Sequence, residues 1–284
     1  MSGAHGANTV WLASYPKSGN TWFRAVHAAW RTGTQVQLDH LDVDGTYAGT
    51  AWREQIDAEL GIVSSLLTDD EINAVRPRVA EIIDARSTGL HLRKTHQAYE
   101  LGPLGEPVVS SAATKCALYF VRDPRDVAVS FAHHLQRSHA FTVQLLADTD
   151  GAIGPDDEGG ARVVGEHLGT WSEHVRGWLD TAPFPVLSIR YEDCTTDPVG
   201  VFGSALRFAG LDPDDGDVER AVASARFDRL QSQEAGDGFR ERPVGINQFF
   251  RRGVAGGWRE ELAPALAQQI ATDHQLMMDR LGYR

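Results

Sequence analysis

Residues 10–22 of this 284-residue chain read VWLASYPKSGNTW, and this stretch decides the fold class. The apolar run at residues 10–13 is typical of a buried strand, residues 16–21 are short and polar, and a helical pattern begins at Trp22. The first N–H groups of a helix have no partner inside it, and the helix dipole favours an anion at that end. The strand, loop and helix therefore predict a phosphate cradle.

The side chains of this loop suit an anion. Gly19 lets the backbone approach a ligand closely, while Ser18, Asn20 and Thr21 add short polar groups and Lys17 adds a positive charge. In the common P-loop the lysine follows the last glycine and is itself followed by Ser or Thr, whereas here Lys17 precedes Gly19. The order of residues therefore favours a nucleotide with a different reacting group.

Lysine is rare in this chain. Of 27 basic residues only Lys17, Lys94 and Lys115 are lysines. An ammonium group is a compact charge whose donors rotate, and a guanidinium is a flat fork. Because the composition otherwise favours arginine, Lys17 and Lys94 are interpreted as positions where arginine would not serve, whereas Lys115 fits an ordinary surface lysine.

The composition is that of an ordinary globular protein with an acidic surface. The net charge of −12 argues against non-specific binding to nucleic acid or anionic membranes. The chain contains no apolar run of about 18 residues that could span a membrane. Residues 1–8 lack the pattern of a signal peptide and are predicted to be disordered. Cys116 and Cys194 are too few for a disulfide framework, so we expect two reduced thiols and a cytoplasmic location.

Strands and helices alternate along the chain. Further strands are predicted at residues 89–93, 117–121 and 186–190, and helices at 21–31, 68–85 with a kink at Pro77, 124–136 and 264–281, while 33–67 stay unassigned. This alternation predicts an α/β fold in which helices flank a P-loop-like parallel sheet, and we interpret residues 1–284 as a single domain. His133, His134 and His139 lie in a helical stretch without other ligands, so no metal site is expected.

Four segments along this alternation carry candidate chemistry. They are Tyr-Pro-Lys-Ser-Gly-Asn-Thr-Trp at 15–22, Arg-Lys-Thr-His at 93–96, Arg-Asp-Pro-Arg-Asp-Val-Ala-Val-Ser at 122–130 and Phe-Arg-Arg-Gly-Val-Ala-Gly-Gly-Trp at 250–258. Ligands of open α/β sheets bind outside the carboxyl ends of the strands. The segments that follow strands are therefore expected to converge there.

In type and order these segments resemble the motifs of cytosolic-type sulfotransferases, which use 3′-phosphoadenosine 5′-phosphosulfate (PAPS). The resemblance adds a fifth match, the Tyr-Glu-Asp turn at 191–193. An arginine-rich composition with little lysine adds the expectation of a bacterial branch acting on small molecules or natural products. The resemblance implies binding of the 5′-phosphosulfate by Lys17, Ser18, Gly19, Asn20, Thr21 and Trp22, of the 3′-phosphate by Arg122 and Ser130, of adenine by Tyr191 and Phe227, and a lid at 234–257 that carries Arg251, Arg252 and Gly253.

The resemblance also implies the reaction. His96 would be the catalytic base, assisted by Lys17 and Lys94, and PAPS would lose its sulfuryl group to a hydroxyl of a small-molecule acceptor and leave as 3′,5′-adenosine bisphosphate. No metal, nucleic acid or membrane partner is expected. The acceptor pocket is assigned to 33–67, 97–113 and 131–168.

The sequence departs from the family pattern at several places, and the C-terminal dimerisation motif of the family is not evident near residues 258–268. Ala225 stands where the family has Thr, with Ser224 one place out of register, and Gly257 replaces the Asp of the lid, which removes a charge partner. Two other functions stay open: a nucleoside-triphosphate-dependent kinase on a P-loop-like sheet, and a nucleotide-binding module without catalysis.

Overall fold

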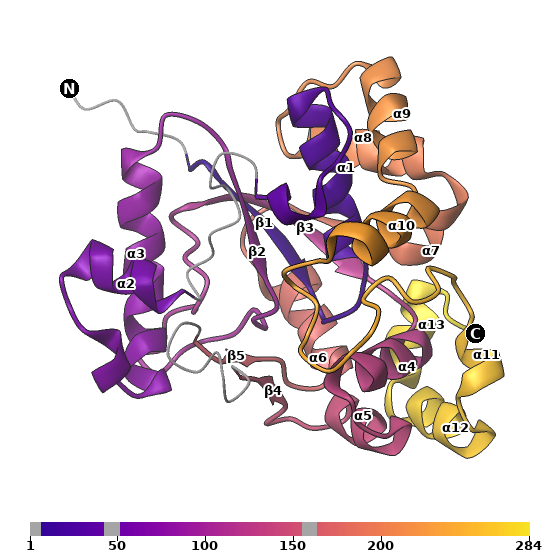
Figure 1. Ribbon diagram of the computed structural model, residues 1–284. Coiled ribbons are helices and arrows are strands. Elements are labelled where there is room, and N and C mark those ends of the chain that lie inside the picture. Colours follow the sequence, from indigo (N-terminus) through magenta and orange to yellow (C-terminus); the bar gives the residue numbers. More distant parts are fainter. Residues whose placement is uncertain (1–6, 43–51, 155–163) are drawn as a thin grey trace. The chain divides into compact units, whose positions relative to one another are not determined.

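The computed structural model describes residues 7–42, 52–154 and 164–284 (Figure 1). The chain divides into two compact units. The first comprises Met1–Tyr15, Gly45–Tyr119 and Thr149–Ser188, and the second Pro16–Asp44, Phe120–Asp148 and Ile189–Arg284. The expectation of a single domain stays a prediction.

The central sheet has four strands: β1 (Thr9–Ser14), β2 (His91–Thr95), β3 (Thr114–Val121) and β6 (Val186–Arg190), in the order β2-β1-β3-β6. β1 and β2 are parallel, with Thr9 opposite His91 and Ala13 opposite Thr95. Every residue of β1 is buried, as expected for an apolar strand covered on both faces. The predicted α/β class with a parallel sheet flanked by helices is confirmed.

The first unit adds helices α2 (Arg53–Leu60), α3 (Asp69–Arg86) and α6 (Trp171–Arg176), a π-helical turn (Gly177–Thr181) and the hairpin β4 (Ala152–Ile153) with β5 (Glu166–His167). α3 begins at the capping box of Thr68 and Glu71 and continues through Pro77. α2 and α3 lie side by side and enclose a core of Ile56, Ile72 and Val79 (Figure 1).

The second unit is mostly helical. Its helices are α1 (Asn20–Thr32), α4 (Pro124–Leu135), α5 (His139–Leu146), α7 (Tyr191–Thr196), α8 (Pro198–Phe208), α9 (Asp215–Ser224), α10 (Phe227–Asp237), α11 (Trp258–Glu261), α12 (Pro264–Asp273) and α13 (Gln275–Leu281). α1 packs against α8 and α9. Its Phe23 ring lies 5.3 Å from that of Phe120 and 6.0 Å from that of Phe202.

Some of the predictions concern residues outside the described ranges. Residues 1–6 belong to the terminus that is predicted to be disordered, and residues 43–51 and 155–163 belong to segments that are predicted to line the acceptor pocket. Within the described terminus, the N–H of Asn8 donates to Asp84 at 2.8 Å. None of the helices in the described ranges is both long and apolar enough to cross a bilayer.

Candidate active site

The loop between β1 and α1 has the backbone of an anion cradle. Lys17 and Gly19 adopt positive φ values of 69° and 106°, and the Gly19 carbonyl accepts hydrogen bonds from the N–H groups of Trp22 and Phe23 at 3.0 and 3.3 Å. Residues with alternating backbone handedness turn successive N–H groups toward one concave side. The loop thus combines such a concavity with the positive end of a 13-residue helix.

Ser18 shows that this cradle fits the oxygens of a phosphate or sulfate group. The residue is 1% exposed, and its hydroxyl oxygen has no hydrogen-bond partner among the described residues. Leaving a buried hydroxyl unsatisfied costs about 1–3 kcal/mol. A ligand oxygen in the cradle would remove that cost.

Gly19 is required by close packing as well as by its backbone angle. A Cβ at this position would lie 2.9 Å from Cδ2 of the Tyr191 ring. Trp22 also lies near this ring, with centroids 6.0 Å apart, and its indole N–H donates to the carbonyl of Ala225 at 3.0 Å. Trp22 therefore supports the site, while Asn20, buried, and Thr21, half-buried, form the first turn of α1.

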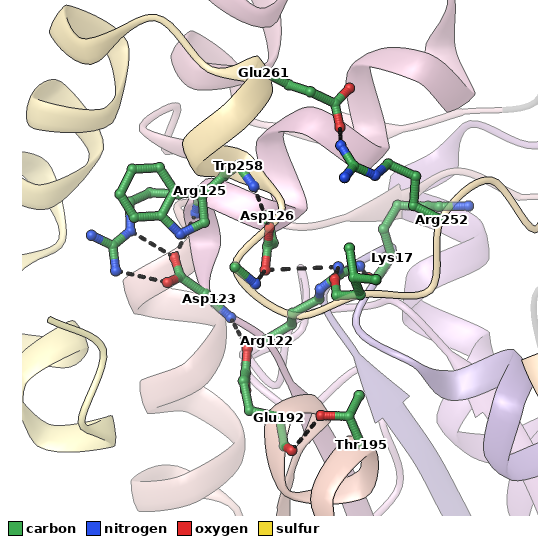
Figure 2. Close-up of polar contacts among 12 residues, drawn as sticks. Lys17, Arg122, Asp123, Arg125, Asp126, Glu192, Thr195, Arg252, Trp258 and Glu261 are labelled. Carbon is green, nitrogen blue, oxygen red and sulfur yellow. Dashed lines mark hydrogen bonds and ion pairs between the residues drawn. The ribbon is translucent and has the colours of Figure 1, made fainter.

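Arg122 joins the other parts of the second unit's site (Figure 2). Its guanidinium donates to the carbonyls of Lys17 at 3.4 Å and Val254 at 2.7 Å, and lies 4.2 Å from the centroid of the Tyr191 ring. Its Nε is buried and has no partner within the described ranges. The structure thus brings together the first loop, the Tyr-Glu-Asp turn and the lid, all around one arginine that the sequence predicted.

Ser130 lies on the helix that follows Arg122. α4 begins after Asp123, whose side chain accepts the N–H of Arg125, and Pro124 occupies the first helical position. Ser130 is half-buried in this helix. Its proposed pairing with Arg122 on one phosphate stays a prediction.

The lid packs closely on the predicted adenine side. Gly253 has a φ of 64°, and a Cβ there would overlap Cδ2 of the Phe227 ring. The Nζ of Lys17 lies 3.9 Å from the centroid of the Phe249 ring, a contact that the sequence did not reveal. Ser224, one place out of register with the threonine of the family, accepts the N–H of Val36 through its hydroxyl at 2.9 Å.

The arginines of the lid already have partners. Arg251 forms a two-pronged ion pair with Glu261 at 2.5 and 2.8 Å, and Arg252 pairs with Glu261 at 2.9 Å and with Glu260 at 2.7 Å. Both arginines of the lid therefore have carboxylate partners within the protein itself. The charge partner missing at Gly257 is supplied three and four residues further on.

Asp126 anchors the end of the lid. Its carboxylate accepts the N–H groups of Gly256 at 2.6 Å and Trp258 at 2.9 Å, and lies 3.8 Å from the guanidinium of Arg122 (Figure 2). Sequence reasoning placed Asp126 in a motif without giving it a role. Its position two residues inside the first turn of α4 was the available signal.

His96, in the first unit, has a defined proton position. Its Nδ1 lies 2.8 Å from the carbonyl oxygen of Ser14, to which it can only donate. The neutral ring therefore carries its lone pair on Nε2, as a proton acceptor requires. Lys94, half-buried on β2 opposite Leu12, is two residues before His96, the spacing at which side chains of an extended chain share a face.

The histidines considered for metal have other contacts. His133 Nε2 lies 3.0 Å from the Gln248 carbonyl, and the His134 ring lies 5.9 Å from that of Phe249. Over residues 7–42, 52–154 and 164–284, no group of three or more His, Cys, Asp or Glu has an arrangement that could hold a metal ion.

Known proteins share this arrangement of elements. A sequence profile of the sulfotransferase domain matches residues 7–282. Flavonol 3-sulfotransferase of Flaveria bidentis is 24% identical over 97% of this chain and 82% of its own length. Mouse sulfotransferase SULT7A1, crystallised with PAP, superposes with a TM-score of 0.59 at 23% identity, covering 95% of this chain and 84% of that one.

A second solved structure, retinol dehydratase in complex with retinol and PAP, gives a TM-score of 0.57 at 19% identity and covers 96% of this chain and 82% of that one. At these identities the superpositions establish the shared fold. The profile, by contrast, accounts for nearly the whole sequence, so the chain belongs to the sulfotransferase family.

Proposed function

We propose that this sulfotransferase takes the sulfuryl group from PAPS and transfers it to a hydroxyl of a small organic acceptor, with His96 as the base. When bound, PAPS supplies the sulfuryl group and leaves as the 3′,5′-bisphosphate. The observation that carries the proposal is the hydrogen bond from His96 Nδ1 to the Ser14 carbonyl, which leaves Nε2 as the proton acceptor. An alcohol or phenol is a poor nucleophile until a base removes its proton.

The donor side of the proposal rests on the second unit. Ser18, Gly19 and the first N–H groups of α1 would bind the 5′-phosphosulfate. The buried Ser18 hydroxyl, which has no hydrogen-bond partner among the described residues, would donate to it. Lys17 and the helix N-terminus would stabilise negative charge that develops on the leaving group. Arg122, Ser130 and the lid arginines would bind the 3′-phosphate, and Tyr191 and Phe227 the adenine.

The base is tested by replacing His96 with Ala. Turnover should fall by about a thousandfold or more, because general-base catalysis contributes about 10²–10⁴ and the ring also orients the acceptor. Binding of the bisphosphate, measured by calorimetry, should stay within about twofold. His40→Ala, at an exposed histidine of the second unit, is the matched control and should retain full activity. Survival of activity within about tenfold in His96→Ala would show that another group is the base.

The nucleotide that binds distinguishes the sulfotransferase proposal from the kinase alternative. Triphosphate chemistry relies on Mg²⁺ held by a P-loop hydroxyl and a strand-end carboxylate. We expect tight binding of 3′,5′-adenosine bisphosphate in EDTA and weak binding of ATP with Mg²⁺. The reverse order of affinities would support the kinase instead, and binding without transfer to any acceptor would support a non-catalytic module.

The acceptor is proposed as a natural-product hydroxyl, such as that of a phenol, sugar or nucleoside. The flavonol in the name of the plant relative and the retinol bound to retinol dehydratase show that similar proteins handle small organic alcohols and phenols. A screen with labelled donor, read as the mass gain of one sulfuryl group, identifies the acceptor. A cytoplasmic location also belongs to the proposal, supported by the two buried free thiols of Cys116 and Cys194.

A further inference from the structure

Glu166 holds the segment that carries His96. Its Oε1 accepts three hydrogen bonds, from the Thr95 hydroxyl at 2.7 Å and from the N–H groups of His96 at 2.9 Å and Gln97 at 3.2 Å. Glu166 is a half-buried residue of β5, about seventy positions away in sequence. One carboxylate oxygen thus binds three donors at the end of β2 and in the segment that follows it.

The hydrogen bonds alone do not require a charged side chain at position 166. The neutral amide of a glutamine could accept the same three hydrogen bonds, and taking a carboxylate out of water is costly. Burial raises the pKa of Glu166, but the charges of His96 and Arg76 and the hydrogen bonds from Thr95 and His96 outweigh burial and hold the pKa below its usual range. The carboxylate is therefore ionised at neutral pH.

Hydrogen bonds from neighbouring residues hold β5 and the segment after β2 in place. Arg76 of α3 is 2% exposed and donates to Gln97 Oε1 at 3.2 Å, which also accepts the N–H of His167. His167 Nδ1 lies 2.8 Å from both oxygens of Glu100, and this hydrogen bond raises the pKa of His167. β5 is thereby fixed on both sides of the Glu166 carboxylate.

The carbonyl side of His96 is held by a neutral histidine. His174 of α6 donates from Nε2 to the His96 carbonyl at 2.9 Å, and the Tyr119 hydroxyl lies 2.8 Å from its Nδ1. Burial lowers the pKa of His174 to about 4, so this ring carries no charge at neutral pH. The charge of His96 lowers the pKa of Glu166, so this carboxylate and the His96 ring interact electrostatically.

We propose that Glu166 is a positioning residue for His96, which fixes the turn that carries the imidazole and places a negative charge beside it. This inference rests on the proposed role of His96 as the base. The hydrogen bonds set the direction in which the ring leaves the backbone. The charge favours the protonated ring that forms when His96 takes a proton from the acceptor.

Two variants separate geometry from charge. Glu166→Gln keeps the acceptor oxygen and removes the charge, so the acid limb of the pH profile of kcat/KM should move to lower pH by about half to one unit. Glu166→Ala removes both, and misplacement of the ring should lower kcat about 10–100-fold. In both variants the Kd of the bisphosphate should stay within about twofold of the wild-type value.

Glu71→Gln is the matched control. Glu71 also accepts a threonine hydroxyl and a backbone N–H, both from Thr68, but is exposed at the start of α3. This variant should leave kcat and the pH profile unchanged. An equal shift in the pH profile of the control would overturn the inference.

Nitrogen-15 NMR of the His96 ring supplies a readout that does not depend on turnover. In the wild type we expect the proton on Nδ1, and in Glu166→Gln a midpoint of titration moved to lower pH by the same half to one unit or so. An unmoved midpoint together with wild-type kcat in Glu166→Gln and Glu166→Ala would overturn the positioning role and leave the base intact. Activity that survives in His96→Ala but is lost in Glu166→Gln would overturn both assignments and make Glu166 the base.

Discussion

The glycine that caps α1 should be irreplaceable for donor binding, and α1 itself provides the control. Gly19 precedes the helix with a φ of 106°, and Gly33 follows it with a φ of 65°. A Cβ at Gly19 would lie 2.9 Å from the Tyr191 ring, whereas a Cβ at Gly33 meets nothing within 4 Å. Gly19→Ala and Gly33→Ala therefore share the cost of a positive φ, but only Gly19→Ala brings a Cβ against the Tyr191 ring.

The magnitudes follow from these two terms. A left-handed backbone costs a non-glycine residue about 1–2 kcal/mol, partly offset by the lower entropy of the unfolded chain, so Gly33→Ala should cost about 1 kcal/mol. Gly19→Ala adds displacement of the Tyr191 ring to this backbone penalty, so it should cost about 2–4 kcal/mol. For a chain of this length each kcal/mol lowers Tm by roughly 2 °C.

Donor binding should separate the variants further. If Gly19→Ala rotates even one N–H group away from the ligand, the loss of a hydrogen bond to a charged group, about 1.5–3 kcal/mol, weakens binding about 10–100-fold. Calorimetry with 3′,5′-adenosine bisphosphate should show this loss for Gly19→Ala and wild-type affinity for Gly33→Ala. Equal affinities in the two variants would refute the assignment of this loop as the phosphate cradle.

Three further predictions concern the 3′-phosphate, the lid and acid stability. Arg122→Ala should raise the Kd of the bisphosphate by about two decades and shrink its preference over the analogue without the 3′-phosphate, since a bidentate contact with a phosphate is worth roughly 2–4 kcal/mol; an unchanged preference would place that phosphate elsewhere. Hydrogen exchange across residues 234–257 should slow when the bisphosphate is added, and equal protection would make this segment a fixed wall. Burial lowers the pKa of His174 from 6.5 to about 4 in the folded protein, so between these values the unfolded chain binds more protons and stability falls as pH falls. Going from pH 7 to pH 5 should therefore cost about 2 kcal/mol through His174, and urea denaturation of His174→Gln should show a pH dependence weaker by that amount; an identical pH dependence would contradict the assignment of a neutral buried ring.

Strands were predictable from sequence because their signals are local. The predicted strand at 186–190 coincides with β6, and the apolar run at 117–121 lies inside β3, which starts three residues earlier. Residues covered on both faces of a sheet leave a continuous apolar pattern. The predicted kink at Pro77 had a weaker basis, and α3 runs through this proline from Asp69 to Arg86.

Helix boundaries far from strong caps were less predictable. The predicted closing helix at 264–281 is divided at His274, which is buried and separates α12 from α13. The described part of the unassigned stretch at 33–67 includes α2 and the short 3₁₀ turns Leu38–His40 and Ser64–Leu66. Such short elements are stabilised by tertiary packing, as Ile56 of α2 is in the core with Ile72, and not by their own periodicity.

The residues of the candidate site were likewise predictable only where their signal is local in sequence. The loop at 16–22 was predictable because its strand, glycine and helix start are adjacent in sequence. Phe249 beneath Lys17 and Glu166 beside His96 were not, because the chain between each pair is long and neither residue belongs to a motif. A lone Glu or Phe carries no sequence signal for the partner that folding brings to it.

The positively charged side chains of the predicted anion site have partners within the protein itself. Lys17 lies over the Phe249 ring, Arg122 donates to two carbonyls, and Arg252 is paired with Glu260 and Glu261. A carbonyl or an exposed carboxylate is a weaker partner for guanidinium than a phosphate dianion. These contacts therefore keep the cations in place in a protein of net charge −12, and we propose that a bound phosphate would replace them as partners.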